Sequence, residues 1–224
     1  MSEDTPTFFD AHQRETVAAA MARIIPTDDT AGATEAGTID FLDRYLSGID
    51  YVYAKPDGSG FEELSGKRAQ AWQQRVDILR TKYVEGVEEL DRRGEKSFGA
   101  PFAALRPDQQ DQVLTEFDDP AETAAVNREQ SVVGFAPVEP ALQQASTEIA
   151  LSFLPLLAFH TRQGFYADPI YGGNRDRIGW QVIGFPGPDS LAEVHSGRYS
   201  VLEYFADGTH QQVMEENRGR QDQA

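Results

Sequence analysis

The stretch KRAQAWQQRVDILRTKYVEGVEELDRR, residues 67–93, decides the fold class of this chain. Its apolar side chains recur at steps of 4, 3, 4, 4 and 3 residues, which is the spacing of one helical face. A continuous stripe of roughly seven turns predicts one long helix that packs this face into a core. We expect Gly94 to end this helix. The stripe consists of Trp72, Val76, Leu79, Tyr83, Val87 and Leu90.

Shorter helices are expected on the amino-terminal side of this stripe. Asp10 and Gln13 have the spacing of a capping box, so a first helix should begin there, and Pro26 should stop it. Apolar residues at helical spacing predict a second helix over about 35–47, with Gly48 as its stop.

Two more helices are expected after the stripe. Arg106-Pro107-Asp108 places a proline at a helix start, and this helix should reach about Phe117. Residues 139–164 read as a further helix, which Pro155 should kink or divide. The sequence therefore predicts a mainly α protein, a compact helical domain with an ordered Gly/aromatic-rich C-terminal loop region. We expect a disordered lead over 1–9, the domain over 10–190 and a partly disordered C-terminal extension over 191–224.

Composition excludes several functional classes. The 224 residues carry 20 Lys plus Arg against 37 Asp plus Glu, a net charge of -17 that repels nucleic acid. The absence of cysteine removes thiol catalysis, disulfides and thiolate metal sites. No apolar run approaches the roughly 20 residues of a membrane span. The acidic N-terminus shows no twin-arginine export signal, so we expect a cytoplasmic protein, or an extracytoplasmic one if a partner carries the signal.

One segment stands out from ordinary loop sequence. Residues 164–176 read GFYADPIYGGNRD, and residues 179–187 read GWQVIGFPG. Glycines permit close backbone approach, and large aromatic rings are typical anchors at protein interfaces. Burial of these aromatics within the domain is the equally weighted alternative. The residues predicted to contact a partner are Phe165, Tyr166, Asp168, Tyr171, Gly172, Gly173, Asn174, Arg175, Trp180 and Phe185.

These two runs resemble the C-terminal signature of the gluconate 2-dehydrogenase subunit 3 family. Two further blocks resemble the same family: RIIPTD at 23–28, followed by Ala36-Gly37 and Ile39-Asp40-Phe41, and Pro101-Phe102 with Leu105, Pro107 and Gln110. The resemblance covers about residues 10–188. It implies a small subunit without a catalytic site of its own, which stabilises a large flavoprotein of the glucose–methanol–choline (GMC) type. That partner would hold FAD and oxidise sugars, sugar acids or polyols, and some members add a cytochrome c subunit.

Other readings of the residues remain open. The chain has no Gly-x-Gly-x-x-Gly motif of the kind that binds FAD or NAD. We therefore assign neither a cofactor nor a catalytic residue to this chain. His12, His160, His195 and His210 lack ligand spacing and read as structural or surface residues. Asp168 and Asp176 could hold a hard cation in an independent enzyme, although Asp168, Asn174 and Asp176 more simply bind their own loop backbone. A stand-alone binding module or assembly chaperone without a permanent enzyme partner is the main alternative function.

Overall fold

The computed structural model describes residues 7–117, 148–185, 187–188 and 192–193. Within these ranges the regular structure is helical, and the β-type pairing is an isolated antiparallel bridge between Ala54 and Phe61. The mainly α fold class is therefore confirmed. The helices are α1 (Ala11–Ile24), α2 (Thr38–Ser47), α3 (Gly66–Phe98), α4 (Pro107–Thr115), α7 (Phe153–Tyr166) and α8 (Ile178–Val182), with 3-10 turns η1 (Ile49–Tyr51), η2 (Phe102–Ala104), η3 (Pro169–Tyr171) and η4 (Arg175–Arg177).

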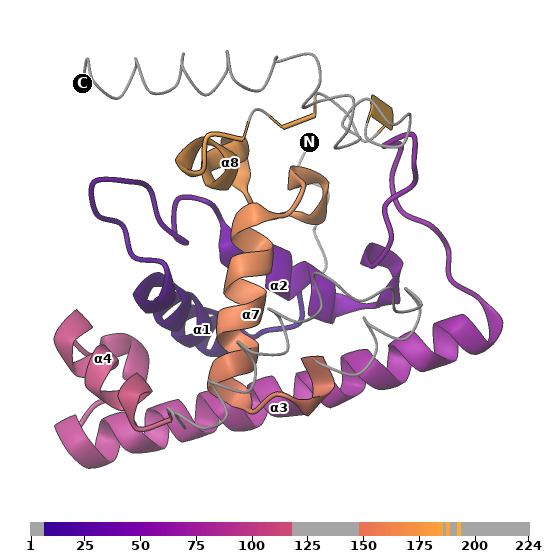
Figure 1. Ribbon diagram of the computed structural model, residues 1–224. Helices are drawn as coiled ribbons and strands as arrows, with labels where there is room; N and C mark the ends of the chain where they lie inside the picture. Colours follow the sequence, from indigo (N-terminus) through magenta and orange to yellow (C-terminus); the bar gives the residue numbers. More distant parts are fainter. Residues whose placement is uncertain (1–6, 118–147, 186, 189–191, 194–224) are drawn as a thin grey trace, which may run out of the picture.

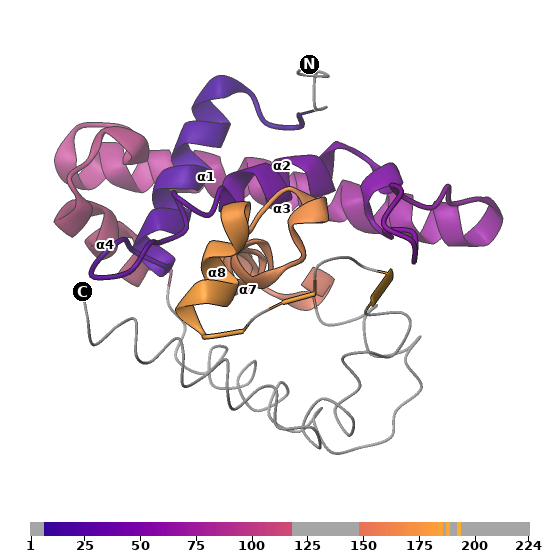
Figure 2. The same ribbon diagram turned by 90° about the horizontal axis from the view of Figure 1, so that it is seen from above.

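Helix α3 is the base on which the other helices rest (Figure 1). Its 33 residues span about 50 Å at a rise of about 1.5 Å per residue. Helix α7 stands across α3, with α1 and α2 on one side of it and α8 at its far end; the view from above looks nearly along α7 (Figure 2). None of the described helices has both the length and the apolar character that crossing a membrane requires.

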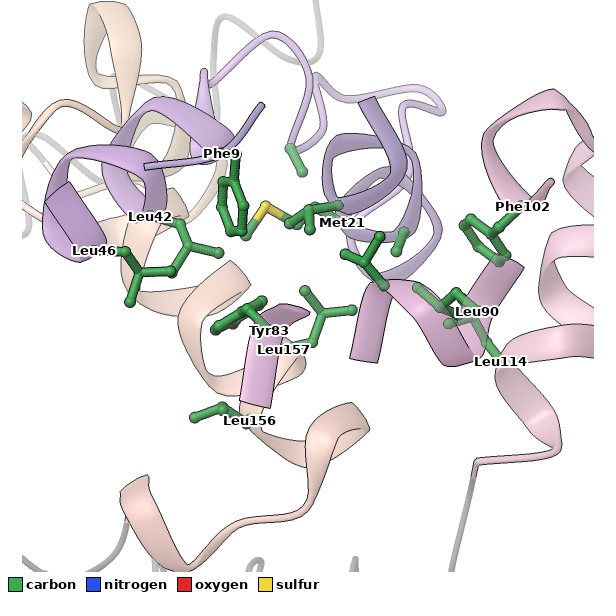
Figure 3. Close-up of a cluster of buried hydrophobic side chains, with 14 of the residues drawn as sticks. Phe9, Met21, Leu42, Leu46, Tyr83, Leu90, Phe102, Leu114, Leu156 and Leu157 are labelled. Carbon is green, nitrogen blue, oxygen red and sulfur yellow. The ribbon is translucent and has the colours of Figure 1, made fainter. Parts of the chain in front are cut away.

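A core of apolar side chains lies where α1, α2, α3 and α7 meet (Figure 3). Met21, Leu42, Tyr83 and Leu157 come from these four helices and are all buried. Each buried side chain of this size contributes about 1.5–3 kcal/mol through its removal from water. Five of the six residues in the predicted stripe are buried, while Trp72 is half-buried and its ring lies nearly perpendicular to that of Tyr53.

The local signals at helix ends are largely confirmed. Gln13 N donates to Asp10 Oδ1 at 2.8 Å, and Asp10 N donates to Gln13 Oε1 at 3.2 Å, which completes the capping box of α1. Gly48 ends α2, and Pro107 is the first residue of α4. Helix α2 begins at Thr38, three residues later than predicted, because Gly37 adopts a left-handed φ of 63° directly before it.

The prediction that Gly94 ends the long helix is wrong. Helix α3 continues to Phe98 and ends at Gly99, which adopts a left-handed φ of 75°. Gly94 lies inside the helix, where the returning chain passes very close. A Cβ there would lie 2.8 Å from the Ala100 carbonyl oxygen and 3.2 Å from Phe102 N. This glycine serves close approach and not helix termination.

The break predicted near Pro155 lies three residues earlier. Ser152 is the N-cap of α7, which places Pro155 in the first turn, where a missing N–H loses no helical hydrogen bond. The helix also passes Gly164 and ends at Tyr166, two residues beyond the predicted end. The earlier part of the predicted helix, residues 139–147, lies outside the described residues.

The predicted disordered lead needs a correction at its last residues. Phe9 is buried in the core, and the backbone N–H groups of Phe8 and Phe9 donate to Asp43 Oδ1 at 2.6 and 3.0 Å. The domain therefore begins before Asp10. Residues 1–6, and all of the C-terminal extension except 192–193, lie outside the described residues.

Candidate partner interface

Residues 167–185, which we call the return segment, turn back onto the carboxyl end of α7 (Figure 1). The last carbonyl groups of a helix have no partner within the helix. Here the indole Nε1 of Trp180 donates to the Tyr166 carbonyl at 2.7 Å, and Asn174 Nδ2 donates to the Ala167 carbonyl at 2.8 Å. Two side chains of the return segment thus cap the helix that precedes it.

Glycines make this close packing possible. A Cβ on Gly173 would lie 2.2 Å from the Gly164 carbonyl oxygen, and a Cβ on Gly179 would lie 1.9 Å from that of Phe165. No side chain fits at such distances, so backbone packs directly on backbone. Gly172 adds a left-handed turn with φ of 102°. The glycines of the signature are therefore explained by packing inside the domain.

The middle of the return segment holds an unusual backbone turn. Asn174, Asp176 and Arg177 all have positive φ angles, of 48°, 55° and 60°. Left-handed conformations cost about 1–2 kcal/mol for most non-glycine residues, so surrounding contacts must hold them in place. Asn174 Oδ1 accepts from Gly179 N at 2.8 Å, and the Ala36 carbonyl accepts from Arg175 N at 2.9 Å.

Further contacts join the return segment to the amino-terminal half of the chain. The Arg175 guanidinium binds Asp40 Oδ2 at 2.7 Å. The hydroxyl of Tyr171 accepts from Ala54 N at 3.2 Å, and its ring lies against Phe61 with the centroids 5.7 Å apart. Asp168 caps its own turn by accepting from Ile170 N at 3.0 Å. The predicted interface residues therefore have defined positions within the domain.

The structure brings all ten predicted residues to one end of α7 but divides them by exposure. Their contact with a partner stays a prediction, and the exposed members are the ones that could make it without rearrangement. Phe165, Gly173, Asn174 and Trp180 are buried, and Asp168, Tyr171 and Gly172 are half-buried. Tyr166, Arg175 and Phe185 are exposed.

Two exposed apolar residues were missed by sequence reasoning. Val182 and Ile183 are 37% and 52% exposed, beside Tyr166 at 39% and Phe185 at 38%. We call these four residues the exposed apolar patch. The signal lay in the run Trp180–Phe185, which offers more apolar side chains than a five-residue helix can bury on one face. Large apolar side chains that gather on a surface mark interaction sites.

A buried polar cluster, which sequence reasoning did not predict as a unit, lies between α3 and α7. His160 Nε2 lies 2.5 Å from Glu148 Oε1, and its Nδ1 lies 2.8 Å from the hydroxyl of Tyr83. Arg75 Nε donates to Glu148 Oε2 at 2.8 Å, and Tyr45 Oη lies 3.5 Å from the same oxygen. His160 was predicted to be structural, and protein groups occupy both of its ring nitrogens.

The electrostatics of this cluster hold a charge inside the domain. Burial alone would raise the pKa of Glu148, but the hydrogen bond from His160 and the charge of Arg75 outweigh burial and lower it. Burial raises the pKa of Tyr83 well above its ordinary value, and the negative charge of Glu148 adds to this. Glu148 is therefore ionised and Tyr83 neutral at pH 7. Both side chains are enclosed, so the cluster braces α3 against α7.

The cation hypothesis finds no support in the geometry. Among the described residues, no group of three or more His, Cys, Asp or Glu side chains is arranged to hold a metal ion. The Asp168 carboxylate accepts a hydrogen bond within its own turn, as the simpler of the two interpretations of this residue predicted.

Comparison with known proteins identifies the family. The model of the family described as gluconate 2-dehydrogenase subunit 3 matches residues 11–187, which includes α1, the core helices and the whole return segment. Searches of curated proteins and of solved structures give no match to this chain. The family match covers most of the chain and ends two residues beyond the return segment. The chain is a member of the gluconate 2-dehydrogenase subunit 3 family.

Proposed function

We propose that this chain is the non-catalytic small subunit of a FAD-dependent dehydrogenase of the GMC type, which it stabilises or assembles. The enzyme would oxidise sugars, sugar acids or polyols, and FAD would be held by the large subunit. The observation that carries the proposal is the family match over residues 11–187, since the family is one of subunits in gluconate 2-dehydrogenase-type complexes. A cytochrome c subunit is a further proposed partner.

The geometry supports a binding role in two ways. The exposed apolar patch lies on the return segment and the end of α7. Helix caps, glycine packing and long-range hydrogen bonds hold this segment in one shape. A pre-organised surface loses little conformational freedom on binding, which favours a stable complex. The titratable cluster around Glu148 is enclosed, so its carboxylate cannot reach a sugar without opening the core.

Co-expression with a candidate GMC flavoprotein tests the proposal. The two chains should co-elute in size exclusion at a fixed ratio, with flavin absorbance in the shared peak. Omitting this chain should lower the yield, the flavin content or the activity of the flavoprotein. Isolated chain, with flavin added, should show no dehydrogenase turnover.

A different outcome would favour the alternative function. If the flavoprotein is equally stable and active alone, and this chain elutes as a separate colourless monomer, the small-subunit proposal is wrong. If the chain raises flavoprotein yield during expression but leaves the mature enzyme, it is an assembly chaperone.

A further inference from the structure

The exposed apolar patch is the main concentration of exposed apolar side chains in the described part of the chain. The described residues include five large apolar side chains that are exposed, and four of the five form the patch: Tyr166, Val182, Ile183 and Phe185. The fifth, Ile78, lies apart from them on α3. Such grouping at one end of the fold indicates a surface that another molecule covers.

The patch draws on the end of α7, the end of α8 and the turn that follows α8. The bond from Trp180 Nε1 to the Tyr166 carbonyl fixes α8 against the end of α7, so Tyr166 adjoins the α8 residues. Phe185 packs its ring on Trp180 with centroids 5.4 Å apart, and Phe185 N donates to the Trp180 carbonyl at 2.8 Å. Buried Trp180 thus holds Phe185 and the backbone of Tyr166 in place.

The stretch 153–185, which carries the patch, differs in the sign of its charge from the chain as a whole. Residues 153–185 contain three arginines (162, 175 and 177) and two aspartates (168 and 176), in a chain of net charge -17. Arg162 lies one turn before Tyr166 on α7, so both face the same way. Arg162 is exposed, and its Nε contacts the Ala158 carbonyl of its own helix at 3.3 Å. A partner with carboxylates at this border would meet attraction here and repulsion from most other faces.

We propose that the exposed apolar patch, bordered by Arg162, is the surface on which the flavoprotein docks. The matching site on the flavoprotein is an apolar recess bordered by carboxylates. This inference rests on the proposed function and adds to it the contact residues and the chemistry of the partner's surface. The contacts come from Val182, Ile183 and Arg162 in addition to Tyr166 and Phe185, and the buried residues of the signature support them.

The test compares charge insertion at two exposed isoleucines in the complex of the full chain with its flavoprotein. Ile183→Asp should raise the Kd at least about tenfold, because it places a carboxylate in the dehydrated centre of the contact. Ile78→Asp is the matched control and should change the Kd by less than about twofold. Thermal unfolding of each free variant should stay close to wild type, since both positions are exposed.

A second pair of variants tests the charge. Arg162→Glu should weaken binding several-fold and flatten the dependence of Kd on salt, because border charges act mainly through long-range attraction. The control is Arg106→Glu, at an exposed position before α4, which reverses the same charge away from the patch. This control should keep the wild-type salt dependence.

The outcomes separate this proposal from the proposed function. If the wild type binds the flavoprotein and Ile183→Asp binds equally well, the docking surface is wrong while the small-subunit function stands. If Ile78→Asp weakens binding as much as Ile183→Asp, the contact is not specific to the patch. If the wild type binds no flavoprotein, the proposed function fails, and the docking proposal fails with it.

Discussion

Helix α3 and the return segment differ in what holds them in place. Helix α3 is fixed by an apolar stripe, whose side chains fill space between helices. The return segment is fixed by missing side chains at Gly173 and Gly179 and by polar caps from Asn174 and Trp180. A region held by volume tolerates substitutions that keep the volume, whereas a region held by backbone contact tolerates no added atom.

The largest expected effect concerns the apolar core, where side-chain volume holds the helices together. Leu157→Ala removes a fully buried side chain and should lower the free energy of unfolding by about 2–5 kcal/mol. Leu157→Met keeps most of the volume and should cost less than about 1.5 kcal/mol. Urea unfolding measures both. Equal losses would show that this core needs an exact shape and not merely a volume.

Adding one methyl group tests the backbone packing of the return segment. Gly179→Ala should destabilise by about 1–3 kcal/mol, because its Cβ would lie 1.9 Å from the Phe165 carbonyl oxygen. Gly48→Ala is the control, since nothing lies within 4 Å of its Cβ and its backbone is extended. Its free energy of unfolding should stay within about 0.5 kcal/mol of wild type. A tolerated Gly179→Ala would contradict the close packing of the return segment.

Two kinds of helix cap sharpen the comparison further. Asp10→Ala removes a local cap of α1 and should cost about 1 kcal/mol. Asn174→Ala removes one buried and one partly buried hydrogen bond and a residue suited to left-handed backbone, so about 2 kcal/mol is expected. Denaturant unfolding gives both values. If Asn174→Ala costs no more than Asp10→Ala, the return segment does not depend on this cap.

The dependence of stability on pH should involve the enclosed carboxylate of Glu148. Its pKa is lowered in the folded state, so its stabilisation is present above the pKa of an unfolded glutamate, about 4.3, and is lost as pH falls below it. Glu148→Gln should therefore flatten the acid limb of a stability–pH curve. Glu88→Gln removes the same charge at an exposed position of α3 and serves as the control. An unchanged acid limb in Glu148→Gln would show that the charge of Glu148 does not stabilise the folded protein.

The sequence predicted those parts of the fold that depend on local pattern. The stripe in α3, the Asp10 box, the Gly48 stop and the proline at the start of α4 all act within a few residues. Gly94 was wrongly predicted to end the helix. A glycine is needed there because the Ala100 carbonyl passes close beside it, and the spacing of apolar residues gives no sign of such a contact. Phe9 was assigned to a lead for the same reason, since its anchor Asp43 lies 34 residues away.

The candidate site was predicted by residue but not by orientation. The ten residues do gather at the end of α7, because they belong to one continuous stretch. Which of them face outward depends on how Gly173 and Gly179 let the chain return onto α7. That return buries Phe165 and Trp180 and leaves Val182 and Ile183 outside. The buried polar cluster joins Tyr45, Arg75, Tyr83, Glu148 and His160, which no linear motif connects.

The hydrogen bond from Arg175 N to the Ala36 carbonyl bears on how the protein is made. A ribosome releases the first helices long before residue 175, so this bond and the one from Ala54 N to Tyr171 must wait for nearly the whole domain. Contacts so distant along the chain form late in folding, because a large loop must close first. The exposed apolar patch runs from Tyr166 to Phe185, so it is complete only in chains whose synthesis has passed Phe185. A partner that reads this patch selects finished domains over nascent ones.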